Sequence, residues 1–483
     1  MKAFFIGAAA LALLLYGIAQ GTLSRPPDDG IIRMRWATDP NPARVTQLSR
    51  FSQMFPHLEV TVDPGLGGDQ TKLIVQCATG TGPAIIDIYD HIQMASLVDA
   101  GVLLDLTPFA KQMGFDPSRT FESVRDQLMI DGRQYRFPCN IATSNLLYNK
   151  RVFDRLGVPY PSDDVTFDEL IQIGKALRRA ARERRERVIP LADMNFIVLL
   201  IAHGGQFFQQ DGLYSSFDSE AAIAAMQMRF DLMHKHGVIP TSVEAATVST
   251  QGGWGGDSLT WFSGDRAAMI LIGRWYTIQL PQYPGLAERL GVTGLPRVPG
   301  LLRMSPIQTR AAGINRNSPY WREALNFLVY LASPEYSELI VADGDGIPPS
   351  PLVAQTGADL VNRFLPNAEL QQAFLDATIN ARNTNLSSFI ENGLVNRLMW
   401  EAQGFVDNRI KTPRQALTDL ADEIERRIDL NLERRPDLQE RFRRVTGMEW
   451  SRDWRRKIPK QRYELAGRKP EEGPTYWERA AAP

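Results

Sequence analysis

Short apolar segments alternate with amphipathic ones near the start of the chain. Alternating apolar residues predict a strand over 31–38, and a continuous apolar run predicts a buried strand over 84–90. A further strand is expected over 58–64, with helices over 42–54 and 69–79 between the strands. Because strands and helices alternate at this spacing, the pattern predicts parallel βαβ units, in which ligands bind beyond the carboxyl ends of the strands.

The segment 131–170 predicts a different order of elements. It holds a polar turn, an aromatic-proline strand, an apolar strand that ends at Tyr148-Asn149, and an amphipathic helix. Thr166 and Glu169 then have the spacing of a capping box, in which each side chain accepts a hydrogen bond from the other residue's backbone N–H. A second helix is therefore expected to begin after Thr166.

Two later helices have a different start signal. Ser318-Pro319 and Thr412-Pro413 each place a cap residue before a proline, which is tolerated at the first helical position. The first pair is expected to open an apolar helix. The second is expected to open a helix with apolar residues at helical spacing.

Length and composition describe an ordinary globular protein that is too long for a single domain. The chain has 483 residues, of which 44% are hydrophobic and 23% charged, and this favours two or three lobes. Its formal net charge of −1 gives no reason to expect a nucleic-acid partner. Arginines gather over 178–187, but Glu183 and Glu186 interrupt them and no aromatic residue lies among them, so a solvated helix face is favoured.

The first residues have the character of an export segment. A basic start at Lys2, an apolar run over 3–19 and the small residues Gly17 and Ala19 at positions −3 and −1 predict a secretory signal peptide cut before Gln20. The run is also just long enough for a membrane anchor, so residues 1–24 are expected to be either a signal peptide or an anchor. Both alternatives mean export, to the periplasm or to the outer face of the cytoplasmic membrane.

The cysteines and acidic motifs predict neither a metal site nor a cofactor. The chain has 2 cysteines, Cys77 and Cys139, and a disulfide and two buried free thiols both stay open. The sequence from Asp343 starts like a calcium loop, but Ile347 and Ala354 stand where oxygen ligands are required.

Six segments follow one another in an order that is typical of one protein family. They are Phe55–Val60, Gly80–Asp87, Leu97–Phe109, Phe262–Tyr276, 313–340 and Gly346–Pro348. Together they resemble the carbohydrate-binding members of extracellular solute-binding protein family 1, the ABC-importer family of the maltose-binding proteins. The segment 131–170 resembles the family's crossover between lobes, and the resemblance extends over roughly 31–430.

The resemblance implies an α/β, two-lobed periplasmic-binding-protein fold of type II, with a ligand cleft between lobes joined by a multi-strand hinge. It implies that one lobe comprises 31–138 and 304–350 and that the other comprises 139–303 and 351–431. Residues 432–483 are expected to form a basic C-terminal appendage.

The resemblance also implies which side chains bind solute. A pyranose has an apolar face that a flat aromatic side chain covers, and a rim of hydroxyls that carboxylates, amides and arginine satisfy. Trp275 is the leading stacking residue and Trp254 a second, while Tyr148 and Asn149 are expected to support the hinge. The candidates for the hydroxyl rim are Asp39, Asn41, Asp90, Asn140, Asp257 and Arg274.

The favoured function is a monomeric receptor that captures a sugar or sugar-like solute by hinge closure and delivers it to ABC permease subunits in the membrane. It has no catalytic residues. One alternative is a glycoside hydrolase, which needs two carboxyl groups roughly 5–9 Å apart. The other is an anchored interaction protein in which the basic tail is the working part.

Overall fold

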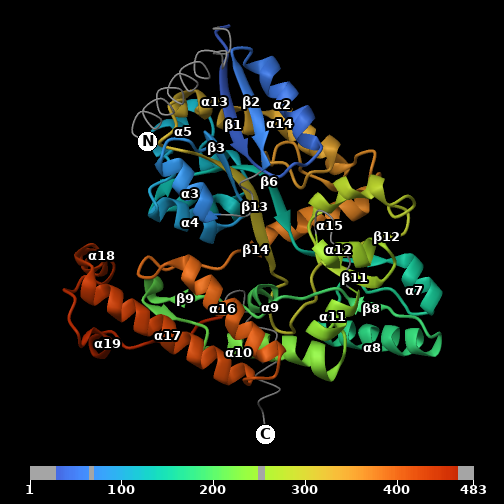
Figure 1. The fold of residues 1–483 in the computed structure, drawn as a ribbon. Helices are drawn as coiled ribbons and strands as arrows, with labels where there is room; N and C mark the ends of the chain where they lie inside the picture. The colour runs from blue at the N-terminus through green and yellow to red at the C-terminus, as the bar shows by residue number, and fades with distance from the viewer. Residues whose placement is uncertain (1–28, 65–69, 249–255, 466–483) are drawn as a thin grey trace, which may run out of the picture.

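The computed structural model describes residues 29–64, 70–248 and 256–465, and the chain forms two lobes (Figure 1). Lobe 1 is built around a six-stranded sheet and lobe 2 around a four-stranded sheet. Trp254 and the expected export segment 1–24 lie outside the described residues. Within the described part of the chain, no helix combines the length and the apolar character needed to cross a membrane.

The sheet of lobe 1 has the strand order β14-β13-β3-β1-β2, with β6 paired to β13. β1 runs parallel to β2 and to β3, as the alternating pattern predicts, whereas β13 runs antiparallel to β3 and β6. The strands are β1 (Ile32–Ala37), β2 (Leu58–Asp63), β3 (Ile85–Ile88), β6 (Phe137–Thr143), β13 (Ser305–Ile314) and β14 (Ala381–Arg382).

Helices and a short hairpin cover this sheet. Its core holds the aromatic rings of Trp36, Phe51, Phe327 and Tyr330, and Trp36 and Phe327 have ring centroids 4.8 Å apart. The helices are α2 (Ala43–Met54), α3 (Gln70–Ala78), α4 (His91–Asp99), α5 (Thr107–Met113), α6 (Glu122–Arg125), α13 (Trp321–Leu331) and α14 (Pro334–Asp343), and the hairpin consists of β4 (Met129–Ile130) and β5 (Arg133–Gln134).

Lobe 2 has a smaller sheet and more helices, with the strand order β12-β7-β11-β8. Its strands are β7 (Asn145–Asn149), β8 (Ile189–Leu191), β11 (Ala267–Ile272) and β12 (Leu290–Thr293), and a separate ribbon pairs β9 (Phe208–Gln209) with β10 (Tyr214–Ser215). Its helices are α7 (Lys150–Leu156), α8 (Phe167–Glu183), α9 (Phe196–Ala202), α10 (Glu220–Phe230), α11 (Ser242–Val248), α12 (Gly256–Ser263), the 3₁₀ segment η6 (Arg274–Gln282), α15 (Ala368–Ile379), α16 (Asn392–Asp407) and α17 (Pro413–Arg434).

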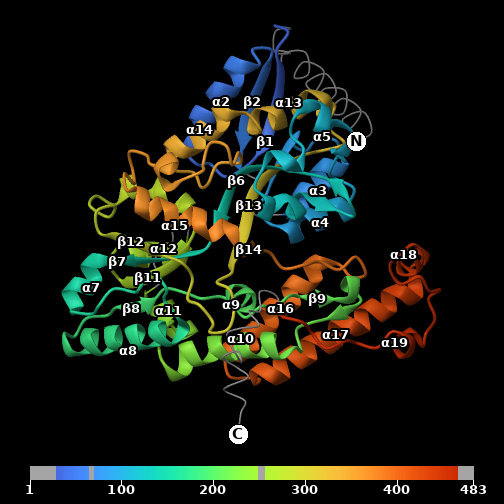
Figure 2. The ribbon, with the colours of Figure 1, turned by 180° about the vertical axis from the view of Figure 1, so that it is seen from behind.

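The chain passes between the lobes where β6 leads into β7, where β12 leads into β13, and between α14 and α16 (Figure 2). The first two passages run through β6 and β13, and the third is the longer segment 344–391, which includes α15 and β14. The two crossing strands agree with a multi-strand hinge. The hinge region is not polar throughout, since Ile141, Ile307 and Ile347 belong to the same apolar cluster as the strands of lobe 2. Backbone hydrogen bonds between Ile141 and Ile347 join two of the passages, at 2.8 and 2.9 Å.

The helix starts agree only in part with the sequence signals. Thr412 and Gln415 form a complete capping box at the start of α17, as predicted for Thr412-Pro413. Thr166 caps α8, but the Glu169 carboxylate accepts from Ser162 and not from Thr166. The prediction for Ser318 was wrong. Its hydroxyl accepts from the Tyr320 backbone N–H in a turn, and α13 begins later, at Trp321.

The chain after α17 folds back on lobe 2 as α18 (Pro436–Thr446) and α19 (Trp454–Lys457). Trp454 is 2% exposed, with its ring 5.4 Å from the rings of both Tyr214 and Phe442. Lys460 then forms ion pairs with Asp218 and Glu425. The described part of the tail is therefore packed against the body of lobe 2.

Replacing Trp454 with alanine tests this packing. Trp454→Ala should lower the free energy of unfolding by about 3–5 kcal/mol, because it leaves a cavity among buried rings. Urea unfolding followed by circular dichroism measures the change. Trp400→Ala is the matched control, since Trp400 is 41% exposed. Equal stability of the two variants would show that the tail does not contribute to the core.

Candidate functional site

A cavity of about 340 Å³ lies where the two lobes meet the crossing strands. Lobe 1 supplies side chains from the ends of β1 and β3 and from α2, and lobe 2 supplies Trp275 from η6. β6, β13 and the turn after α14 complete the wall. The lining residues are Asp39, Arg44, Tyr89, Asn140, Ala142, Trp275, Gln308, Arg310 and Asp345.

Two buried arginines and their carboxylates form one wall of the cavity. Arg44 donates to Asp345 and to Asp39, at 2.7 and 2.8 Å. Arg310 donates to Asp87 at 2.9 Å and to Asp345 at 3.2 Å. The side chains of Arg44, Arg310 and Asp345 are at most 6% exposed, so this network of charges is almost fully removed from water.

The indole of Trp36 supports the network from the core of lobe 1. Its Nε1 donates to Asp87 Oδ1 at 2.7 Å. The guanidinium carbons of Arg44 and Arg310 lie 5.4 and 5.6 Å from its ring centroid, within the range of a cation–π interaction. The charged wall and the aromatic core of lobe 1 are therefore one continuous structure.

The network also determines protonation at the cavity surface. Burial disfavours the charged form of Asp39, but the charges of Arg44 and Arg310 outweigh it and lower the pKa of this carboxyl. Burial, together with the charges of Asp87 and Asp39, raises the pKa of the Tyr89 hydroxyl, which donates to Asp39 Oδ1 at 3.3 Å. At neutral pH the cavity thus presents an ionised carboxylate beside a neutral phenol.

Trp275 enters the cavity because Gly273 lets the chain approach β6 closely. A Cβ atom at Gly273 would lie 2.8 Å from the Thr143 carbonyl oxygen and 3.1 Å from the Trp275 ring. No larger residue fits there without a shift of the backbone. The Gly-x-Trp spacing therefore has a structural cause, and it leaves the Trp275 ring partly exposed beside Ala142.

The structure brings three of the predicted site residues together, namely Asp39, Asn140 and Trp275. Asn140 is held in place, since its Nδ2 donates to the backbone oxygen of Asp345 at 2.6 Å and to its carboxylate at 3.2 Å. These three side chains come from lobe 1, from a crossing strand and from lobe 2.

Two other predicted residues lie outside the cavity lining, in front of helices. Asn41 is 4% exposed, and its Oδ1 accepts from the Ala43 backbone N–H at the start of α2. Asp90 accepts from the Gln93 backbone N–H at the start of α4. Both follow strand ends, as expected, but their oxygens stabilise the next helix.

Arg274 and Asp257 also lie outside the cavity lining. Arg274 is 0% exposed, and it donates to Gln371 and to the backbone oxygens of Gly346 and Leu360. Burial lowers the pKa of this guanidinium to about 9. Arg274 is therefore a fixed cross-link between η6 and the chain after α14, and not a rim residue. Asp257 lies in the first turn of α12.

Tyr148 and Asn149 lie just beyond the first passage, inside the sheet of lobe 2. Tyr148 packs against Phe153 and Tyr160, with ring centroids 5.7 and 5.4 Å away. Asn149 is 0% exposed and donates to Asp265 at 2.7 Å. These partners all belong to lobe 2, so the contacts of Tyr148 and Asn149 fix β7 within that lobe.

Sequence reasoning missed Arg44, Tyr89, Gln308, Arg310 and Asp345. For Arg310 a signal was present, because a single charged residue in a buried apolar strand needs a buried partner of opposite charge. Asp87 in β3 has the same signal. The two cysteines are free and buried, which resolves the alternative that the sequence left open.

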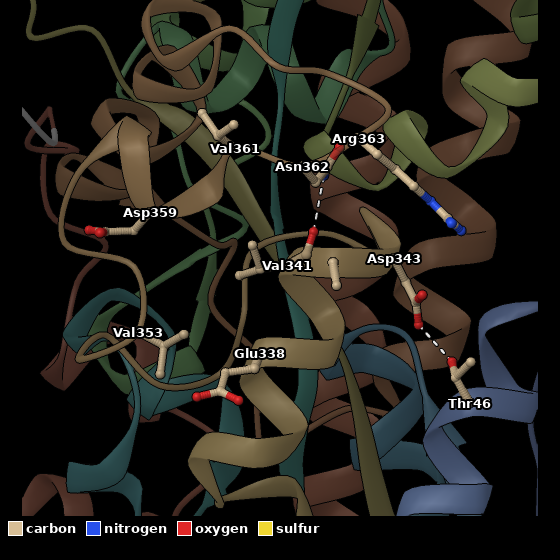
Figure 3. A pocket seen from close by; sticks show the side chains of 10 residues that line it. Thr46, Glu338, Val341, Asp343, Val353, Asp359, Val361, Asn362 and Arg363 are labelled. Carbon is tan, nitrogen blue, oxygen red and sulfur yellow. Dashed lines mark hydrogen bonds between the residues drawn. The ribbon is translucent and has the colours of Figure 1, made fainter.

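A second cavity, of about 580 Å³, lies beside α14 (Figure 3). Three carboxylates, Glu338, Asp343 and Asp359, surround it with only Arg363 as a lining cation. Asp343 accepts from Thr46 at 2.8 Å, and burial raises the pKa of this carboxyl. This cavity lacks the aromatic side chain that distinguishes the first one.

Comparison with known proteins agrees with this architecture. Residues 38–338 match the sequence profile of a family described as bacterial extracellular solute-binding protein. An ABC substrate-binding protein of Listeria monocytogenes, solved in complex with cycloalternan, superposes with a TM-score of 0.69 at 19% identity. The superposition covers 82% of this chain and 98% of that one, and at this identity it shows the fold alone.

Two characterised relatives match shorter segments. The arabinooligosaccharide-binding protein of Halalkalibacterium halodurans is 28% identical over 110 residues, which are 22% of this chain. The diacetylchitobiose-binding protein DasA of Streptomyces coelicolor is 25% identical over 187 residues, which are 37% of this chain. The matches span only 23% and 41% of the length of these relatives.

Removing one charge tests the buried network. Asp345→Asn should lower the free energy of unfolding by about 3–5 kcal/mol, because Arg44 and Arg310 lose a buried carboxylate that both contact. Urea unfolding measures the loss.

Asp343→Asn is the matched control for Asp345→Asn, and it should change stability by less than about 1 kcal/mol, since burial already disfavours the charge of Asp343. Similar losses in the two variants would show that the network does not hold the fold together.

Proposed function

Because the chain belongs to the family of bacterial extracellular solute-binding proteins, we propose that it is the receptor of an ABC importer for a sugar or sugar-like solute. The observation that carries this proposal is the 340 Å³ cavity, with Trp275 on one lobe and a fixed set of charged and amide groups on the other lobe and on the crossing strands. The receptor captures its solute without changing it and passes it to permease subunits in the membrane.

The cavity has the two kinds of surface that a saccharide needs. The ring of Trp275 covers the C–H face of a pyranose, and Asp39 accepts hydrogen bonds from its hydroxyls as an ionised carboxylate. Asn140 adds an amide whose orientation is fixed by Asp345. Because these groups are held before the solute arrives, little conformational entropy is lost when it binds.

The relatives support a saccharide as the solute class. Both are named for oligosaccharides, an arabinooligosaccharide and diacetylchitobiose, and the superposed structure holds cycloalternan. The family's extracellular character supports export of this chain, to the periplasm or to the outer face of the membrane. We take the receptor to be a monomer that needs no cofactor.

Capture is proposed to follow hinge closure of the two lobes around the solute. In this proposal residues 31–138 and 304–350 move as one lobe, and 139–303 and 351–431 move as the other. β14 and most of β6 are exceptions, because they pair with β13 in the sheet of lobe 1. Residues 432–483 form an appendage of the second lobe. The passages between the lobes bend during closure, while Tyr148 and Asn149 keep β7 in place beside the first passage.

The cavity gives less support to a glycoside hydrolase. Such an enzyme uses one carboxyl group with a raised pKa as a general acid and a second as base or nucleophile. The pKa of Asp39 is lowered, and Asp345 contacts two arginines. An ionised Asp39 accepts hydrogen bonds from hydroxyls but has no proton to donate.

Saccharides should stabilise the purified protein against heat. A solute that binds only the folded state adds about 2.7 kcal/mol at a hundredfold excess over Kd. Differential scanning fluorimetry against a panel of mono- and oligosaccharides, with amino acids and peptides as controls, measures the shift. A shift with peptides and none across the saccharide panel would contradict the proposed solute class.

Trp275→Ala should weaken binding of the saccharide found in that screen by about 2 kcal/mol, or roughly thirtyfold in Kd, because the apolar face of the sugar loses its cover. Isothermal titration calorimetry measures the change. Trp400→Ala, on the exposed surface of α16, should bind like the parent protein. Unchanged affinity of Trp275→Ala would remove this residue from the site.

A further inference from the structure

An ion pair joins the C-terminal tail to the opposite lobe. Arg441 of α18 contacts the carboxylate of Asp131 in the β4–β5 hairpin of lobe 1. The two side chains are 25% and 47% exposed, so the pair lies at the surface, where water and ions reach it. In both views α18 stands at the outer end of α17, on the side of the molecule that also holds α4 (Figures 1 and 2).

Both partners are held by rigid structure. Asp131 and Gly132 have φ values of 51° and 75°, which gives a tight two-residue hairpin turn that fixes the position of the carboxylate. On the other side, Leu438 and Phe442 of α18 are buried in the core of lobe 2. Arg441 therefore moves with lobe 2, and Asp131 moves with lobe 1.

A second set of contacts lies between the same two bodies. Asp99 at the end of α4 is exposed, and Arg435 and Arg441 of the tail are neighbouring positive charges, although Arg435 forms its ion pair with Asp437. Ile92 of α4 packs against the core cluster of lobe 2. A Cβ atom at Gly393, in the first turn of α16, would lie 3.3 Å from Ser96 Oγ. Helix α4 thus rests on lobe 2 along the side where the tail arginines lie.

We propose that α18 is an electrostatic latch, in which Arg441 of the tail binds Asp131 of lobe 1 and favours the arrangement in which the lobes are in contact. Closure brings these charges together, and opening separates them. The ion pair stabilises the closed arrangement, so a smaller part of the free energy of solute binding is needed to close the lobes. It requires only the two-lobed fold and does not depend on which solute is bound.

The contact has the strength expected of an adjustable latch. An exposed ion pair contributes little compared with buried apolar packing, so it biases an equilibrium without locking it. Ions weaken such a pair, because screening at high ionic strength shortens the range of the attraction to a few ångströms. The distribution between open and closed lobes should therefore depend on salt even without solute.

Spin labels on the two lobes test the latch in the solute-free protein. Val45→Cys on α2 and Ile410→Cys after α16 are 75% and 65% exposed and mark one lobe each, while the native Cys77 and Cys139 are buried. Pulsed electron resonance gives the distance distribution between the labels. Arg441→Glu should shift the ratio of closed to open lobes roughly two- to fivefold towards open. High salt should shift the parent protein in the same direction.

Two variants keep the test specific. Arg443→Glu is the matched control, since Arg443 pairs with Glu440 on the same helix, and it should leave the distribution unchanged. The double variant Arg441→Glu with Asp131→Arg restores the pair with its charges reversed and should return the distribution to that of the parent. Equal distributions for the parent and Arg441→Glu, or equal shifts for Arg441→Glu and Arg443→Glu, would overturn the latch. Because no solute is present, either result leaves the proposed receptor function untouched.

Discussion

The structure depends on the need to neutralise two arginines that are buried beside the cavity. Arg44 and Arg310 have lost their water, and a buried charge without a partner costs several kcal/mol. Their carboxylates come from β3, from the end of β1 and from the turn after α14. The ion pairs of the two arginines therefore fix the relative positions of β1, β3, α2, β13 and the turn after α14. The same arrangement holds Asn140 and Asp39 at the cavity surface.

Sequence patterns predicted the first three strands of lobe 1 and the helices between them. Three of the cavity residues were expected from the family resemblance: Asp39, which follows β1, Asn140, which lies within β6, and Trp275 of the Gly-x-Trp segment. The partners of the arginines were out of reach, because Arg44 and Asp345 are 301 residues apart and Arg310 and Asp87 are 223 apart. The local sequence pattern indicates that a buried charged residue needs a partner of opposite charge, but only the folded structure shows which residue is that partner. The cap predictions show the same limit, since the Ser318 hydroxyl accepts a hydrogen bond from Tyr320 in a turn and does not cap α13.

The two lobes are joined by an apolar contact at the crossing strands and by a partly charged contact at the surface. The crossing strands form an apolar hinge region around Ile141, Ile307 and Ile347, which is costly to expose. The contact of α4 with α16 has a small apolar part, and the neighbouring contact of α18 with the β4–β5 hairpin consists of charged groups that water can solvate when they separate. Motion should therefore pivot at the strands and open at the charged side. Because the cavity is lined from both lobes, such a motion changes the distance between Trp275 and the lining residues of lobe 1.

The lining residues differ in how freely evolution can change them. Arg44, Arg310 and Asp345 serve the core of lobe 1 and the cavity together, so a substitution there threatens the whole chain. Ala142 and Gln308, on the two crossing strands, line the same cavity but lie outside the network, and Gln308 is exposed. Changes in solute specificity among descendants of this protein are thus expected at positions such as Ala142 and Gln308, where a substitution leaves the buried network intact. A new preference can be acquired there while the inherited scaffold stays intact.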